Sequence, residues 1–187
     1  YYIVYKMIEF GNKQVETIKD EWIDYLMGDY HVFQTSRGNS LVSLAGGINE
    51  ELLKTAMEND GLKEGTEFKK TGAQQNGDFI MFSTAQDHPR LFVEVKSYKA
   101  RERLQRGLAE ISDGDKVGFG YFTDAREFGV KHAYRLIDAG ASAVYLPQQT
   151  LDDISAEAKA VTTSRRAGRG SLLYRPIEQF VTDMKKY

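Results

Sequence analysis

The sequence predicts an α/β fold in which helices flank a central mixed β-sheet on both faces. Segments with apolar residues at three- and four-residue spacing alternate with short apolar runs that suit strands. Through the middle of the chain the predicted order is helix, strand, strand, helix, strand, helix, strand. The length of 187 residues, 41% of them hydrophobic, is enough for one domain with a sizeable core.

The first part of the chain is predicted to contain helices separated by polar segments. Apolar periodicity and the helix-stopping Gly28 define the first helix, and Asn49 is a suitable N-cap for the second. In order, we expect an edge strand or a leader at 1–5, a helix at 14–28, a polar loop or short strand at 31–44, a helix at 49–59 that opens after Gly46-Gly47, and a polar connection at 63–77.

Two apolar strands joined by a polar turn form the centre of the predicted sheet, at 77–83 and 91–97. Alternation with a period of two puts Glu94 and Lys96 on one face of the second strand and its aliphatic residues on the other. If the hairpin closes symmetrically, Asp78 lies level with this pair, and cross-strand neighbours are about 5 Å apart. A register slip of one residue would turn Asp78 to the opposite face.

The second half of the chain alternates between helices and strands, and this order favours helices on both faces of the sheet. We expect a helix at 99–111, a strand at 116–123, a helix at 124–138, a strand at 141–146, a helix at 151–161, a flexible loop at 162–171 and a terminal helix at 177–187.

Bulk composition excludes several classes of site. The sequence has no cysteine, which excludes disulfides and cysteine-ligated metals and fits a reducing, intracellular (cytoplasmic) setting. No apolar run approaches membrane-spanning length and no signal peptide is recognisable, so we expect no membrane partner. The net charge of −2 gives no global sign of nucleic-acid binding, which would therefore need local basic patches.

Three charged residues, Asp78, Glu94 and Lys96, interrupt the apolar hairpin. Magnesium prefers oxygen ligands and keeps several waters, so two carboxylates hold it and leave room for a phosphate. The metal polarises a phosphoryl oxygen and lowers the pKa of a bound water, while a neighbouring lysine positions that water or stabilises developing charge. Glu-x-Lys alone is more often an exposed pair on a solvated strand. The preceding aspartate, the apolar strand and the basic helix that follows favour a metal site here.

Asp78, Glu94-Val95-Lys96 and the order of elements around them resemble the PD-(D/E)xK nuclease superfamily, which has the restriction-endonuclease-like fold. Gly77 stands where the family name has proline. The resemblance implies a Mg²⁺-dependent phosphodiester hydrolase, in which Asp78 and Glu94 bind the metal and Lys96 assists the attacking water.

The resemblance also implies a domain organisation and a further metal ligand. We expect a single nuclease domain over 1–187, with a catalytic core at about 46–147 and accessory, DNA-contacting segments at 1–45 and 148–187. Many members place a glutamate from the preceding helix near the metal, which makes Glu50 a candidate, or Glu51 beside it. A capping role in the first helical turn explains both carboxylates equally well.

Basic residues next to such a site are candidates for phosphate contacts. Charged runs are otherwise usually solvated faces, and disorder is the alternative for the late arginine loop. The candidate DNA-binding residues are Arg37, Lys99, Arg101, Arg103, Arg165, Arg166 and Arg169.

The expected function is Mg²⁺-dependent endonucleolytic cleavage of double-stranded DNA. A type II restriction endonuclease that acts as a homodimer is the first choice. A DNA repair or recombination nuclease, such as a Holliday junction resolvase, is the alternative. A non-catalytic DNA-binding module that keeps the fold is the third reading, and the intact set of Asp, Glu and Lys argues against it.

Overall fold

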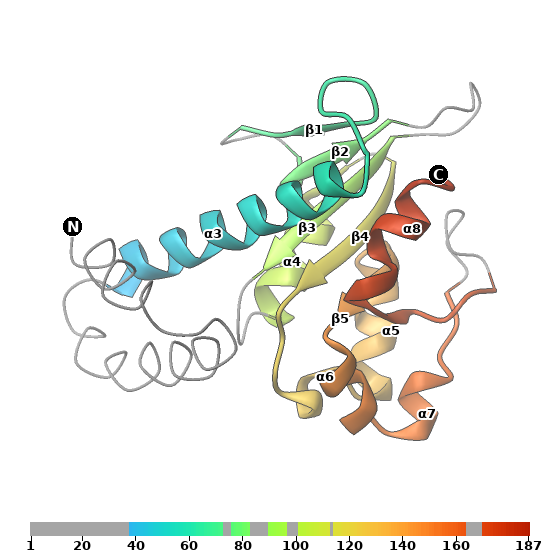
Figure 1. Cartoon of the computed structure of the whole chain (residues 1–187). Coiled ribbons are helices and arrows are strands. Elements are labelled where there is room, and N and C mark those ends of the chain that lie inside the picture. The colour runs from blue at the N-terminus through green and yellow to red at the C-terminus, as the bar shows by residue number, and fades with distance from the viewer. Residues whose placement is uncertain (1–37, 73–75, 83–89, 97–100, 113, 164–169) are drawn as a thin grey trace, which may run out of the picture. The chain divides into compact units, whose positions relative to one another are not determined.

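The computed structural model describes residues 38–72, 76–82, 90–96, 101–112, 114–163 and 170–187 (Figure 1). Contacts divide the chain into two compact units, Tyr1–Leu44 and Ala45–Tyr187. The description below concerns the second unit and helix α3 (Gly38–Asn59), which begins in the first. The elements predicted at 1–5 and 14–28 lie outside the described residues, and the single-domain organisation stays a prediction.

Six strands form one mixed sheet in which spatial order follows chain order. The strands are β1 (Phe68–Lys70), β2 (Phe79–Met81), β3 (Leu91–Lys96), β4 (Asp115–Gly120), β5 (Ala141–Leu146) and β6 (Tyr174–Pro176). The pairs β1–β2 and β2–β3 are antiparallel, whereas β3–β4, β4–β5 and β5–β6 are parallel. The predicted α/β fold with a mixed sheet is therefore confirmed.

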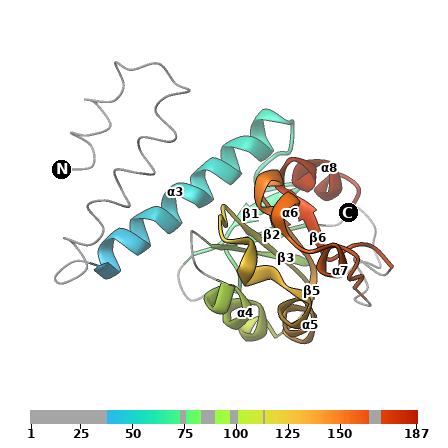
Figure 2. The same cartoon turned by 90° about the horizontal axis from the view of Figure 1, so that it is seen from below.

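Helices cover both faces of this sheet, as Figure 2 shows for α4 (Arg101–Glu110) and α5 (Val130–Asp138) on one side, and for α8 (Phe180–Met184) and the part of α3 that carries Leu53 and Met57 on the other. The α-helices are α3 (Gly38–Asn59), α4 (Arg101–Glu110), α5 (Val130–Asp138), α6 (Gln148–Asp153), α7 (Ala156–Lys159) and α8 (Phe180–Met184). Within the part of the chain that is described, no helix is both long and apolar enough to cross a membrane.

Each face of the sheet has its own apolar core. Val93 and Val95 of β3 point to the face where Leu53 and Met57 of α3 pack with Phe180 of α8. The opposite face is covered by α4 and α5, whose buried residues include Leu104, Leu108, Ala133 and Leu136. The period-two alternation of β3 thus directs its aliphatic residues to one core and leaves Glu94 on the side of α4.

Helix α3 begins earlier than the sequence predicted. The predicted loop at 31–44 is helical from Gly38 onward, and the helix continues through Gly46 and Gly47. Each residue added to a helix closes one more backbone hydrogen bond, which offsets the lower helix propensity of glycine, about 1 kcal/mol relative to alanine. The prediction that the helix opens after the glycine pair was wrong.

Two short strands were not predicted. Strand β1 lies inside the segment predicted as a polar connection, and β6 follows the segment predicted as a flexible loop. Each has three residues, over which alternation with a period of two cannot be recognised. Pairing with β2 and β5 holds them at the two edges of the sheet.

Several predicted helices are interrupted. The helix predicted at 124–138 consists of a 3₁₀ turn, Ala125–Phe128, and α5, separated by Gly129 in an extended conformation. The helix predicted at 151–161 is broken at Ile154, after which Ser155 begins α7 by accepting a hydrogen bond from the N–H of Ala158. The predicted terminal helix is a 3₁₀ turn, Ile177–Gln179, followed by α8. The predicted helix at 99–111 and the strands at 116–123 and 141–146 are present as α4, β4 and β5.

Candidate active site

The register of β2 and β3 places Asp78 opposite Glu94. Phe79 pairs with Val93, and the backbone N–H of Asp78 donates to the Val93 carbonyl at 2.8 Å, so the antiparallel pairing extends one residue beyond β2. Gly77, with φ of +66°, turns the chain just before Asp78. The register is the one that the sequence predicted, and both carboxylates lie on the face covered by α4.

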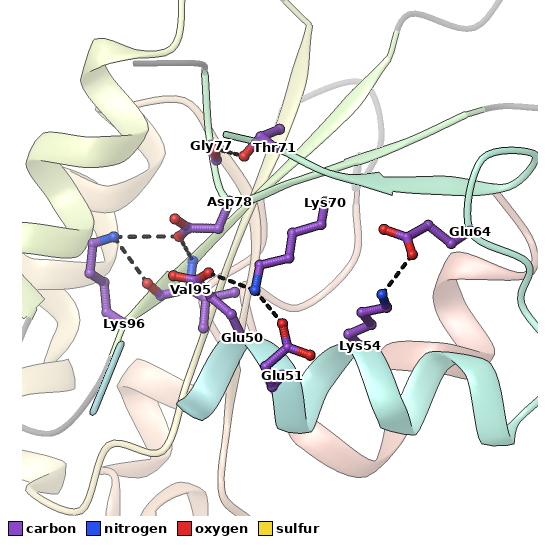
Figure 3. Close-up of polar contacts among 10 residues, drawn as sticks. All are labelled: Glu50, Glu51, Lys54, Glu64, Lys70, Thr71, Gly77, Asp78, Val95 and Lys96. Carbon is purple, nitrogen blue, oxygen red and sulfur yellow. Dashed lines mark hydrogen bonds and ion pairs between the residues drawn. The ribbon is translucent and has the colours of Figure 1, made fainter. Parts of the chain in front are cut away.

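Asp78 is anchored to the neighbouring strand through its side chain. Its Oδ2 accepts a hydrogen bond from the backbone N–H of Val95 at 2.6 Å. On the other side, the N–H of Thr71 donates to the Asp78 carbonyl at 3.0 Å, and the Thr71 hydroxyl donates to Gly77 at 2.5 Å (Figure 3). Contacts from β3 and from the segment that follows β1 therefore fix the position of Asp78.

Three oxygen atoms converge on the ammonium group of Lys96. Its Nζ lies 3.5 Å from Asp78 Oδ2, donates to the Val95 carbonyl at 3.0 Å and forms an ion pair with Glu94 Oε1. Figure 3 shows the Lys96 side chain directed toward Asp78 and the Val95 backbone. The two carboxylates and the lysine therefore form one charged cluster.

Glu94 is the most buried member of this cluster, with 7% of its surface exposed. Burial raises the pKa of its carboxyl group, the positive charge of Lys96 opposes this shift, and the negative charge of Asp78 adds to it. Helix α4 covers Glu94 at Gly107, because a Cβ atom on that glycine would stand 2.5 Å from the carboxylate carbon. A buried carboxylate in such a position needs a neighbouring cation.

The oxygen atoms around Lys96 Nζ suit a magnesium ion. Two carboxylates and a backbone carbonyl are hard ligands, and the positively charged ammonium group of Lys96 is the cation that they surround in this structure. No group of three or more Asp, Glu or His side chains placed to hold a metal occurs among the described residues. Magnesium is often bound by only one or two carboxylates, together with waters and substrate phosphates, so Asp78 and Glu94 fit that pattern.

The predicted additional carboxylate, Glu50, pairs with a lysine in this structure. Glu50 Oε2 lies 3.3 Å from Lys70 Nζ, and Glu51 Oε1 lies 2.5 Å from the same atom, so α3 and β1 are linked by a shared cation (Figure 3). The side chain of Glu50 is 24% exposed and that of Glu51 is 62% exposed. The structure therefore does not bring Glu50 into a three-carboxylate group with Asp78 and Glu94.

Of the predicted DNA-binding residues, two lie in the described part of the chain. Arg101 and Arg103 belong to α4, and both are partly buried. The side chain of Arg101 is only 14% exposed and lies 3.2 Å from Glu102, so little of its surface is open to a phosphate group. Arg37, Lys99, Arg165, Arg166 and Arg169 lie outside the described residues.

Sequence reasoning missed three contributors to this site. The Val95 backbone supplies both an N–H for Asp78 and a carbonyl for Lys96. Lys70 neutralises Glu50, and Gly107 makes room for the Glu94 carboxylate. A glycine in the middle of an otherwise amphipathic helix was a visible signal for close packing at Gly107, whereas the other two contributions depend on strand pairing.

No family model matches the sequence, and no curated protein matches it. Two solved structures have a similar fold. Restriction endonuclease PspGI in complex with substrate DNA has a TM-score of 0.54 and 19% identity, over 87% of this chain and 69% of that chain. Metal-depleted Ecl18kI in complex with uncleaved, modified DNA has a TM-score of 0.50 and 13% identity, over 96% of this chain and 57% of that chain.

These likenesses identify the arrangement of strands and helices. The order of elements, the mixed sheet and the two covering layers are those of the restriction-endonuclease-like fold, as the sequence predicted. At such low identity the likeness concerns the fold alone, and the chemistry has to be argued from this chain's own side chains.

Proposed function

We propose that this chain, which has a restriction-endonuclease-like fold, is a Mg²⁺-dependent endonuclease that hydrolyses phosphodiester bonds of double-stranded DNA. The observation that carries the proposal is the convergence of Asp78, Glu94 and Lys96 on one face of the β2–β3 pair. Burying three charged groups on an otherwise apolar strand pair costs free energy, and clusters of this kind gather at functional sites. The fold of PspGI, a restriction endonuclease bound to its substrate DNA, supports the same class of activity.

Each residue of the triad has a distinct role in this proposal. Asp78 and Glu94 would hold the magnesium ion, which would supply Lewis-acid activation of the phosphoryl group and of a bound water. Lys96 would give up its ion pairs with the carboxylates when the metal binds, orient the attacking water and stabilise negative charge that develops on the phosphate. The hydrogen bond from Val95 keeps Asp78 in place during these changes.

The proposed biological role is that of a type II restriction endonuclease that cuts both strands as a homodimer. PspGI is described as a restriction endonuclease, and Ecl18kI is described in complex with DNA, which supports this role for a chain with their fold. The chain spans 69% and 57% of the lengths of those two proteins, so each of them has segments without a counterpart here.

Further contacts are proposed on the same basis. We assign Glu50 as an additional metal ligand that leaves Lys70 when metal and DNA are present. Phosphate contacts are assigned to Arg103 on α4 and to the basic residues that lie outside the described part of the chain, Arg37, Lys99, Arg165, Arg166 and Arg169. Arg101 is assigned a lesser share of DNA binding because its side chain is largely buried.

Cleavage of plasmid DNA tests the proposal. With Mg²⁺, we expect the unmodified protein to cut a plasmid into discrete fragments and Lys96→Ala to leave it intact. Lys131→Ala is the matched control, because this lysine is exposed on α5 and is not one of the three residues Asp78, Glu94 and Lys96. Equal cleavage by the unmodified protein and Lys96→Ala would refute the site.

Selective cutting of branched DNA would instead identify a junction resolvase, and no cutting with any divalent metal would leave a DNA-binding module.

A further inference from the structure

We infer that Gly107 is a positioning residue, which sets the place of the Glu94 carboxylate by letting the backbone of α4 lie directly against it. The inference rests on the proposed function for its catalytic meaning, because Glu94 is there a metal ligand. Its structural part, the contact between one glycine and one carboxylate, is tested separately from any nuclease activity.

The three atoms nearest to the position of a Cβ on Gly107 all belong to the Glu94 side chain. A Cβ atom built on Gly107 would lie 2.1 Å from Glu94 Oε1, 2.5 Å from Cδ and 3.0 Å from Cγ. Real Cβ atoms essentially never come closer than 3.0 Å to another heavy atom, and the first two of these distances are shorter than that. Any residue other than glycine at this position therefore displaces the Glu94 side chain or the helix.

Backbone conformation does not account for a glycine here. Gly107 lies in the regular part of α4 and is absent from the residues with positive φ. Glycine in the interior of a helix is unfavourable compared with alanine, because it loses more conformational entropy on folding. The remaining reason for glycine at this position is the close approach of the carboxylate.

Helix α4 cannot move away from the sheet to accommodate a side chain. Leu104 and Leu108 on either side of Gly107 are completely buried. Leu104 packs on Gly118, the β4 residue that pairs with Glu94, at a distance where a Cβ on Gly118 would lie 2.9 Å from a leucine methyl group. Lys116 Nζ donates to the Leu108 carbonyl at 2.9 Å and holds the following turn of the helix.

The direction of the Glu94 carboxylate follows from this packing. Glu94 Oε1 is both the atom nearest to the Cβ position of Gly107 and the atom that forms the ion pair with Lys96 Nζ, so the carboxylate lies between the α4 backbone and Lys96. A methyl group at position 107 would occupy the space that the carboxylate now fills and push the Oε1 atom out of that cluster. Gly107 would then act on catalysis through Glu94, without contact to substrate.

The structural part is tested by unfolding with denaturant, without metal, in two backgrounds. We expect Gly107→Ala to lower the unfolding midpoint of the unmodified protein, because the methyl group collides with Glu94. In the Glu94→Ala background the same change should raise the midpoint, because the collision is gone and alanine favours the helix. A higher midpoint in both backgrounds, or a lower midpoint in both, would overturn the inference.

Gly47→Ala is the matched control for the comparison of Gly107→Ala in the unmodified and Glu94→Ala backgrounds. Gly47 is also a helical glycine, in α3, and a Cβ there meets no atom within 4 Å. We expect this substitution to shift the midpoint by the same amount in both backgrounds. A change of sign confined to position 107 then identifies the contact with Glu94 as its cause.

The catalytic part is tested by calorimetric titration with Mg²⁺ and by the Mg²⁺ dependence of plasmid cleavage. We expect Gly107→Ala to weaken metal binding by at least about tenfold and to raise the half-saturating Mg²⁺ concentration to match, while Gly47→Ala leaves both unchanged. Unchanged metal binding in Gly107→Ala would overturn the positioning role. If the unmodified protein binds Mg²⁺ and cuts no DNA, the proposed function fails. The unfolding experiments in the two backgrounds still test the contact between Gly107 and Glu94.

Discussion

Asp78 lies opposite Glu94 across the β2–β3 pair, and its Oδ2 accepts the backbone N–H of Val95, the residue that follows Glu94. This relationship joins the two carboxylates through the sheet backbone as well as through the shared Lys96 ammonium group. The carboxylates therefore have a defined separation before any metal arrives. Such preorganisation is what a metal site needs from its protein.

Asp78→Asn should slow cleavage strongly and keep the fold. The amide oxygen of asparagine still accepts the Val95 N–H, so the strand pairing survives, whereas the negative charge that we propose as a metal ligand is lost. We expect the cleavage rate to fall by at least about a hundredfold with an unchanged circular dichroism spectrum. Cleavage within a few-fold of the unmodified protein would remove Asp78 from the site.

Removal of the metal should stop cleavage and leave the protein folded. Without metal, Lys96 pairs with both carboxylates and compensates their charge, and the cores on the two faces of the sheet contain only side chains. We expect a chelator to block plasmid cleavage completely and to shift the melting temperature only slightly. Added Mg²⁺ should restore cleavage. Full activity in the chelator would contradict metal dependence.

Glu50→Gln and Glu51→Gln distinguish the two candidates on α3. Both glutamates contact Lys70, but Glu50 is the less exposed of the two. We expect Glu50→Gln to weaken Mg²⁺ binding in the presence of DNA by about tenfold, and Glu51→Gln to leave it unchanged. If the two variants behave alike, the interaction with Lys70 is structural and Glu50 is no ligand.

Tyr145→Phe should affect stability and leave cleavage unchanged. The Tyr145 hydroxyl donates to Asp183 at 2.9 Å, and the residue is 1% exposed on the face of the sheet opposite Glu94. We expect the free energy of unfolding near neutral pH to fall by about 1 kcal/mol, which denaturant titration would measure. A large loss of cleavage in this variant would mean that the two faces are coupled.

The same variant has a defined pH dependence. Burial raises the pKa of Tyr145 in the folded state above its ordinary value of 10.0. Because the unfolded chain ionises this tyrosine first, its contribution to stability is present below pH 10 and is lost as the pH rises above it. The difference in unfolding free energy between the unmodified protein and Tyr145→Phe should therefore shrink above pH 10. A constant difference would contradict the burial of this hydroxyl.

The central sheet and the triad were predictable because they depend on strong local signals. Alternation in β3 placed Glu94 and Lys96 on one face, and the symmetric closure of the hairpin placed Asp78 beside them. The edge strands were missed because three residues carry no periodicity. The pairing of Glu50 with Lys70 was missed because it joins a helix to a strand that local sequence does not reveal. Gly107 was visible as a residue, but its role appears only when α4 is packed on β3.

Single-turnover cleavage by Asp78→Asn, Glu94→Gln and the double variant tests the central claim most directly. If the two carboxylates hold one metal ion, each single change removes the whole contribution, and the double variant should be no slower than the slower single variant. Each single variant should be at least about a hundredfold slower than the unmodified protein. Rate losses that multiply in the double variant, or a single variant that cuts at the unmodified rate, would contradict a shared metal centre.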